Sequence, residues 1–124
     1  MSRVPAEAAA AAFRRDLGAC VCCGTLVTDR PCAARRRNPH AGDGLANLLT
    51  FLGDGSRPGD PDDHYARVES GTDPADAARG FRLRHGQDPA LVSVAVASSA
   101  WGGVTVWLDG TESYAMVPPG GVAA

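Results

Sequence analysis

The sequence predicts an α+β protein: a small three-stranded antiparallel sheet covered by helices, with a Cys-rich N-terminal knuckle. Three observations support this prediction. Valine alternates with small residues in the last third of the chain, two segments of the first half have helical character, and all four cysteines fall between positions 20 and 32. In a chain of 124 residues we expect one compact domain with two parts. Residues 1–41 would form an Ala-rich helix and the knuckle, and residues 42–124 the α+β body.

The C-terminal third predicts a β-meander. Val92, Val94 and Val96 alternate with small residues, and residues 104–108 repeat this pattern. Asp109-Gly110 is a two-residue turn signal, and the segment after it supplies the third strand. The valines of such a sheet fall on one face, which needs a helix to cover it because a sheet of this size cannot stand alone.

Helices are expected in three places. Residues 5–17 combine a first-turn proline with five consecutive alanines, and Gly18 follows as a stop. Residues 43–52 place four leucines on one helical face, which would cover the valines of the sheet. A third helix should begin at residues 72–74, where aspartate precedes proline, and end as late as Gly86. Residues 53–63, rich in Gly, Asp and Pro, predict a surface loop.

Composition limits the class of protein. Leu, Val and Phe together fall just below the fraction of roughly one fifth at which apolar burial begins to fail, so the core is thin. The chain has no lysine and no isoleucine but many arginines, as a GC-rich genome would produce. Neither a signal peptide nor an apolar stretch of membrane-spanning length is visible. We therefore expect a cytoplasmic protein whose thiols stay reduced.

The cysteine cluster predicts a structural zinc site. Cys20, Cys22 and Cys23 are followed by glycine, and the C-x-x-C spacing lets a tight turn direct two thiolates at one ion. Cys32 would supply the third ligand, and Cys22 or His40 the fourth. Zinc would then order a segment too poor in apolar residues to order itself.

Two other interpretations of the thiols stay open. They can be metal-free, half-buried side chains that pack as small hydrophobic groups. Alternatively, Cys20 and Cys23 form a redox dithiol, with nearby arginines favouring the thiolate. A thioredoxin-like motif opens a helix, whereas turn residues follow Gly24 here, so catalysis is the least favoured interpretation.

Charge is distributed unevenly. Residues 1–42 carry seven arginines against three carboxylates, a net of +4, and residues 43–124 carry five against eleven, a net of −6. The run Arg35-Arg36-Arg37 is a type of basic edge that contacts phosphate, which gives a nucleic-acid partner weak support. Because arginine is the only strong cation of this chain, the simpler interpretation of the run is a solvated surface.

Three aromatic residues predict a protein-binding face. Trp101, Trp107 and Tyr114 fall in the meander and would lie opposite the valines; alternatively, they pack against the first helix. The sequence thus favours a small non-catalytic binding or assembly protein with a structural zinc knuckle and a protein partner. The alternatives are a metal-free interaction factor, of a toxin-neutralising or phage-type structural kind, and then a thiol-redox enzyme.

Overall fold

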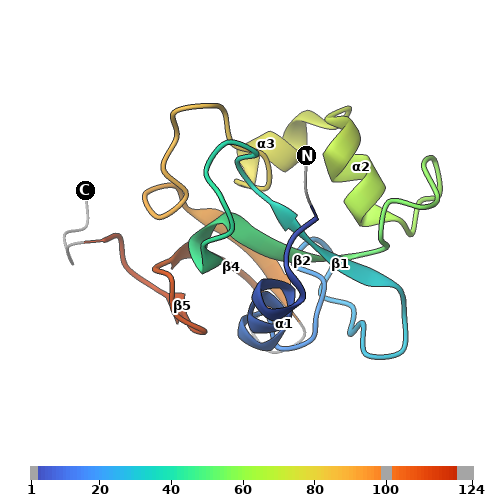
Figure 1. The fold of residues 1–124 in the computed structure, drawn as a ribbon, viewed down its shortest axis with the longest axis horizontal. Helices are drawn as coiled ribbons and strands as arrows, with labels where there is room; N and C mark the ends of the chain where they lie inside the picture. The colour runs from blue at the N-terminus through green and yellow to red at the C-terminus, as the bar shows by residue number, and fades with distance from the viewer. Residues whose placement is uncertain (1–2, 99–101, 120–124) are drawn as a thin grey trace.

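The computed structural model describes residues 3–98 and 102–119 and confirms a mixed α+β fold (Figure 1). Two antiparallel sheets form its centre, one with the order β1-β2 and one with the order β3-β4-β5. No helix of the described residues is long and apolar enough to cross a membrane. The elements in chain order are α1 (Ala6–Arg15), β1 (Cys32–Arg36), the 3-10 helix η1 (Leu45–Asn47), β2 (Leu48–Leu52), α2 (His64–Ser70), α3 (Pro74–Ala78), β3 (Val94–Ser98), β4 (Gly102–Leu108) and β5 (Tyr114–Ala115).

The C-terminal meander is confirmed. Strand β3 pairs with β4, so that Val94 lies opposite Val106 and Val96 opposite Val104. Strand β5 then pairs with the end of β4 through Leu108 and Tyr114. The connection therefore spans residues 109–113, so the predicted two-residue turn is wrong, and the third strand is shorter than predicted. The predicted valine face is buried at Val94, Val96 and Val106, which are at most 1% exposed. Val104 is half-buried, and Val92 precedes β3.

The helix predicted over residues 43–52 is wrong. Only η1 is helical there, and β2 continues as a strand in which all five residues are buried. Leu49 and Phe51 face the main core, whereas Leu48 packs with Ala12 and Ala34 beneath α1. A strand covered on both faces is apolar throughout, and over so few residues this pattern also fits a helical stripe.

The other helices agree in part. Helix α1 forms as predicted and ends before Gly18, which has a φ of +67°. Helix α3 begins after the predicted cap Asp73 but stops at Ala78, well before Gly86. The sequence prediction missed α2 altogether. That helix begins directly after the predicted 53–63 loop, and its N-cap is the last loop residue, Asp63.

The arginine run is not a solvated surface. Arg37 is fully buried and Arg35 is 5% exposed, while Arg36 forms an ion pair with Asp43. The Arg37 guanidinium donates to the carbonyl oxygens of residues 46, 80, 89, 92 and 93. Burial, with a contribution from Arg15, lowers the pKa of Arg37 to about 10, so this side chain stays charged at neutral pH. In a chain with a thin apolar core, Arg37 joins three segments through their backbones.

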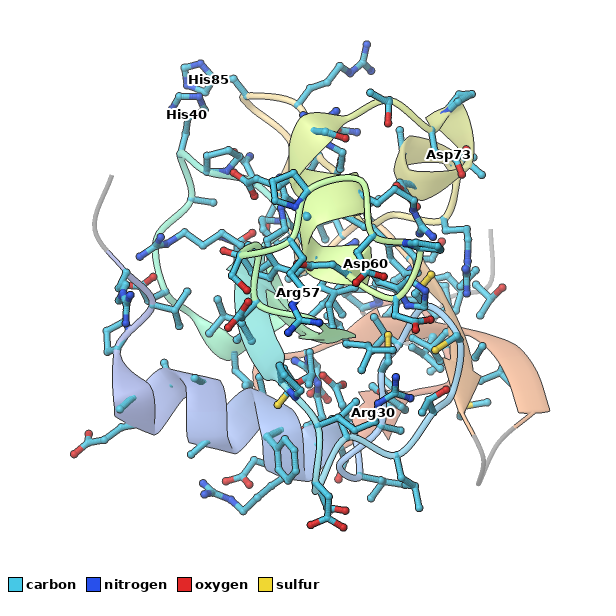
Figure 2. The ribbon with its side chains drawn as sticks, turned by 90° about the vertical axis from the view of Figure 1, so that its right-hand side faces the viewer. Arg30, His40, Arg57, Asp60, Asp73 and His85 are labelled. Carbon is cyan, nitrogen blue, oxygen red and sulfur yellow. The ribbon has the colours of Figure 1, made fainter. Side chains whose placement is uncertain are left out.

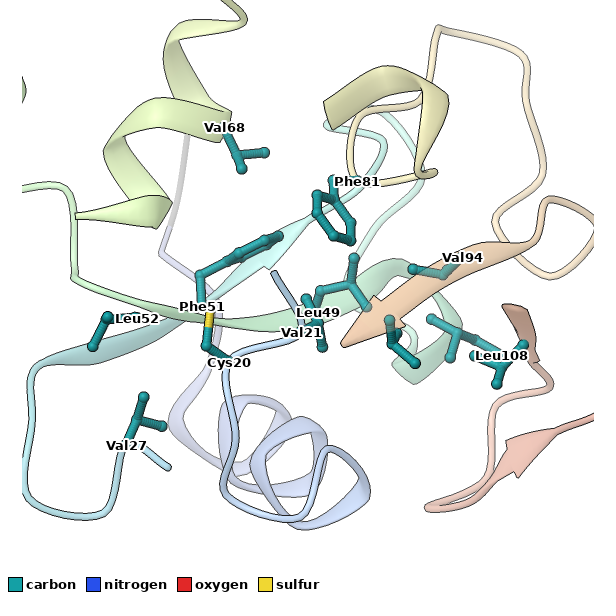
Figure 3. Close-up of a cluster of buried hydrophobic side chains, with 12 residues drawn as sticks. Cys20, Val21, Val27, Leu49, Phe51, Leu52, Val68, Phe81, Val94 and Leu108 are labelled. Atoms are coloured by element: carbon teal, nitrogen blue, oxygen red, sulfur yellow. The ribbon is translucent and has the colours of Figure 1, made fainter. Parts of the chain in front are cut away.

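The main core places one cysteine at its centre. It joins Leu49 and Phe51 of β2 with Val68 of α2 and Phe81, whose ring meets Phe51 edge to face at 5.3 Å. Cys20 is fully buried in the same cluster, beside Phe51 (Figure 3). The N-terminal cysteine segment is therefore anchored in the same core as the body.

Candidate metal centre

A short hairpin brings two of the cysteine sulfurs together. The amide of Cys20 donates to the Thr25 carbonyl at 2.9 Å, and the amide of Gly24 donates back to the Cys20 carbonyl at 2.8 Å. Gly24 has a φ of +77°, a conformation that favours glycine and closes the turn. The bridge between Ala19 and Leu26 completes the hairpin. Cys20 and Cys23 thus stand on one tight turn, as the C-x-x-C spacing predicts.

The start of helix α2 adds an imidazole. Asp63 caps the helix by accepting a hydrogen bond from the amide of Ala66, and His64 is the first helical residue. The His64 Nδ1 lies 3.5 Å from Cys20 Sγ. The candidate ligand atoms of Cys20, Cys23 and His64 all lie within 4.8 Å of one another. These three residues are therefore close enough to hold a metal ion.

The electrostatic setting differs at each candidate ligand. Burial raises the pKa of the Cys20 thiol to about 12, and backbone amides of Leu52, Cys23 and Cys22 oppose this shift by donating to the sulfur. Burial and then Arg67 lower the pKa of His64, which keeps its imidazole neutral, as metal ligation requires. Cys23 is exposed, and its thiol donates to Thr25 Oγ1 at 3.1 Å. The group thus has one buried and one solvent-facing thiol.

Cys22 points to a different set of partners. Its Sγ accepts a hydrogen bond from Arg67 Nη2 at 2.9 Å, and Arg79 Nη1 lies 3.7 Å away. Two hydrogen bonds fix the Arg67 guanidinium on the buried carboxylate of Asp76, and these bonds are the main reason why the pKa of Arg67 is raised. Cys22 is therefore held by arginines and does not join the group of Cys20, Cys23 and His64.

The remaining predicted ligands lie elsewhere. Cys32 stands at the start of β1, where partial burial raises the pKa of its thiol. His40 is exposed, and its ring centroid lies 4.5 Å from that of His85. Figure 2 shows these two imidazoles together at one end of the molecule, with Arg30 in the opposite half. Among the described residues, neither Cys32 nor His40 joins the group.

Sequence reasoning did not place His64 among the zinc ligands, because it lies 41 positions beyond Cys23. A local signal was nevertheless present. Asp63 suits an N-cap, and the residues from His64 to Val68 can form a helix, so the sequence permits a histidine presented at a helix start. Only the packing of α2 against the hairpin shows which cysteines this histidine meets.

Two of the three aromatic residues predicted to bind a partner lie within the described part of the chain. Trp101 lies outside the described residues. Trp107 is half-buried on β4. Tyr114 is half-buried too, and its hydroxyl donates to the buried carboxylate of Asp16 at 2.6 Å, with the Arg15 guanidinium 5.9 Å from its ring. Tyr114 thus ties β5 to the end of α1.

The chain matches no protein-family model, and the comparisons with curated proteins and with solved structures likewise find no match.

Proposed function

We propose that Cys20, Cys23 and His64 bind one zinc ion, and that this ion fixes the cysteine hairpin to helix α2 in a small non-catalytic binding or assembly protein. The observation that carries the proposal is the convergence of three ligand atoms from two distant segments. We place the protein in the cytoplasm, where both thiols stay reduced.

The donor set favours zinc. Two thiolates and one imidazole are ligands that Zn²⁺ prefers, whereas Ca²⁺ and Mg²⁺ take oxygen donors. An iron–sulfur cluster held by four thiolates would also need Cys22 and Cys32, which lie outside the group. Zinc is therefore the ion that best fits these three side chains.

A structural role fits the surroundings of the group. Three protein ligands leave one position of a tetrahedral ion to water, an opening that catalytic zinc sites use. No carboxylate of the described residues joins the group, so its own members offer such a water no general base. Binding would instead stabilise the fold: at a free zinc concentration of 1,000 times Kd, linkage contributes about 4 kcal/mol.

The test is metal analysis of protein purified without chelator, followed by titration of the metal-free protein with Co²⁺. We expect about one zinc per chain and a thiolate-to-cobalt charge-transfer band. Cys23→Ser and His64→Asn should abolish both signals. Cys23 is exposed, so its substitution removes a ligand without opening the core.

The matched control is Cys32→Ser, which should leave the metal content unchanged. Metal-free protein with four reactive thiols would overturn the proposal and favour a metal-free interaction protein. A metal content that depends on Cys32 but not on His64 would place the site elsewhere. A Cys20–Cys23 disulfide that forms reversibly would favour a redox role.

A further inference from the structure

We propose that the outer edge of strand β1 is a binding site for an extended peptide segment of a partner protein, with acidic residues at its two ends and apolar residues between them. This site does not depend on the metal centre. It forms part of a groove between α1 and α2, which lie on either side of β1 in Figure 1.

Backbone hydrogen bonds show which groups of β1 face outward. The Gly53 amide donates to the Pro31 carbonyl just before the strand, and the Arg37 amide donates to the Asn47 carbonyl just after it. Hydrogen-bonded pairs alternate along an antiparallel ladder, so the backbone groups of Cys32 and Ala34 point away from β2. Among the described residues these groups have no hydrogen-bond partner. Such an edge can accept another strand.

The edge lies inside a groove with two adjoining chambers. The larger, of about 600 Å³, lies between Arg3 and Val4 on one side and Tyr65 and Glu69 of α2 on the other. The smaller, of about 370 Å³, is lined mostly by apolar side chains, including the Phe13 ring. Both chambers are lined by Ala9, Cys32, Ala33 and Ala34. The small side chains of α1 and β1 leave this space open.

The shape of the groove favours a single extended peptide over a second copy of the folded chain. Because walls rise on both sides of β1, the edges of two copies of this chain would be kept apart by their own walls. A single extended segment has no such walls and can reach the strand. Its alternate side chains would point into the apolar chamber beside Phe13, which favours apolar residues at the centre of the peptide.

The arginines that line the groove favour a peptide with acidic residues at its two ends. Arg3 and Arg14 line the two chambers, and their guanidinium groups can meet acidic residues of a peptide. The other two lining arginines already have carboxylate partners, Arg35 with Glu69 and Arg36 with Asp43. Arg14 lines only the smaller chamber, and Arg3 lines only the larger one. The ion pair of Arg14 with Glu112 is exposed, so a carboxylate of the peptide can replace Glu112 at little cost.

The test measures the fluorescence anisotropy of three labelled peptides of the form Glu-Val-X-Val-Glu, with Val, Leu or Phe at X, during titration with the whole protein. We expect saturable binding of at least one peptide. Ala34→Pro removes only an outward-facing amide, which an edge strand tolerates, and should weaken binding about fivefold to tenfold. Ala9 lines both chambers, so Ala9→Leu narrows both and should weaken binding at least as much. Ala6→Leu, on the same helix but outside the groove, is the matched control and should bind as the wild type does.

Several results would overturn this proposal. One is the failure of all three peptides to bind, and another is unchanged affinity in Ala9→Leu. Equal binding of a peptide whose central amides are N-methylated would show that strand pairing is not involved, even if Ala34→Pro does not fold. Sedimentation that reveals a dimer which Ala34→Pro dissociates would assign the edge to a second copy. Cys23→Ser should bind peptide normally, so a failure of the metal proposal is distinguishable from a failure of this one.

Discussion

Asp63 organises both the 53–63 loop and the start of helix α2, and we predict that Asp63→Ala weakens the fold and the metal centre together. Its carboxylate is 4% exposed and accepts hydrogen bonds from the amides of Ala66 at 2.9 Å, Arg57 at 3.0 Å and Gly55 at 3.2 Å. The chain closes so tightly here that a Cβ on Gly53 would lie 2.2 Å from Asp63 Oδ1. One side chain therefore satisfies three backbone donors.

The magnitude follows from these contacts. A hydrogen bond to a charged acceptor contributes about 1.5–3 kcal/mol. Water can reach part of the loop after truncation, so we take about 1 kcal/mol for each of the three bonds. The expected loss in the free energy of unfolding is then about 3 kcal/mol, which exceeds the ~1 kcal/mol of an ordinary N-cap. At about 4 °C per kcal/mol for a chain of this size, the melting temperature should fall by about 12 °C.

Urea denaturation of the metal-free protein measures this loss. Asp60→Ala is the matched control, because Asp60 is only half-buried and its carboxylate accepts one bond in the same loop, from the amide of Asp62. The control should change stability by no more than about 0.5 kcal/mol. Cobalt affinity of Asp63→Ala should fall about tenfold, since the residue that positions His64 is lost. A stability loss below about 1 kcal/mol would refute the role given to Asp63.

Three further substitutions test the polar contacts by urea denaturation. Arg37→Met should cost about 3–5 kcal/mol, because buried carbonyl groups lose their donor, whereas Arg57→Met at an exposed site should cost almost nothing. Burial and a neighbouring carboxylate raise the pKa of Tyr114, so its contribution to the free energy of unfolding is complete below pH 10 and is lost as pH rises further. Tyr114→Phe should therefore cost about 1–2 kcal/mol at pH 7 and lack that decline in stability at alkaline pH. Gly80→Ala should cost about 3 kcal/mol, because its Cβ would lie 2.2 Å from a carbonyl oxygen, and Gly59→Ala, at a similar φ in open space, only about 1 kcal/mol. Equal losses within either matched pair would contradict the corresponding contact.

Local signals predicted the parts of this fold that depend on neighbouring residues. The meander follows from its alternating valines, although residues 109–113 connect β4 to β5 in place of the predicted two-residue Asp109-Gly110 turn. Helix α1 follows from its alanines and Gly18. The helix prediction for residues 45–52 failed because the conformation of this segment depends on which elements cover it. With α1 packed on one face and Phe81 on the other, the leucines form a strand buried on both sides.

The buried arginines show a second limit. Nothing in the run Arg35-Arg36-Arg37 distinguishes a solvated face from a core position, because every acceptor of Arg37 is a backbone carbonyl of another segment. Because every residue has a backbone carbonyl, the sequence does not show which carbonyl groups a buried arginine will bind. A GC-rich genome explains the many arginines and so favoured the interpretation of the run as a solvated surface. The same bias leaves arginine as the only strong cation that this chain can use to bind buried carbonyl groups.

The same reasoning explains why half of the candidate site was predictable. Cys20 and Cys23 lie together because of a five-residue turn, whereas His64 reaches them only through the capped start of α2. A core low in leucine, valine and phenylalanine depends on polar connections, of which Arg37 between distant segments and Asp63 within its own loop are two. A zinc ion held by Cys20, Cys23 and His64 would be a third, and it would connect the cysteine hairpin to helix α2. If zinc has this role, the hairpin and α2 of the metal-free protein should lose their protection from hydrogen exchange before the rest of the chain does. If both stay protected without metal, the apolar core alone is sufficient to hold them.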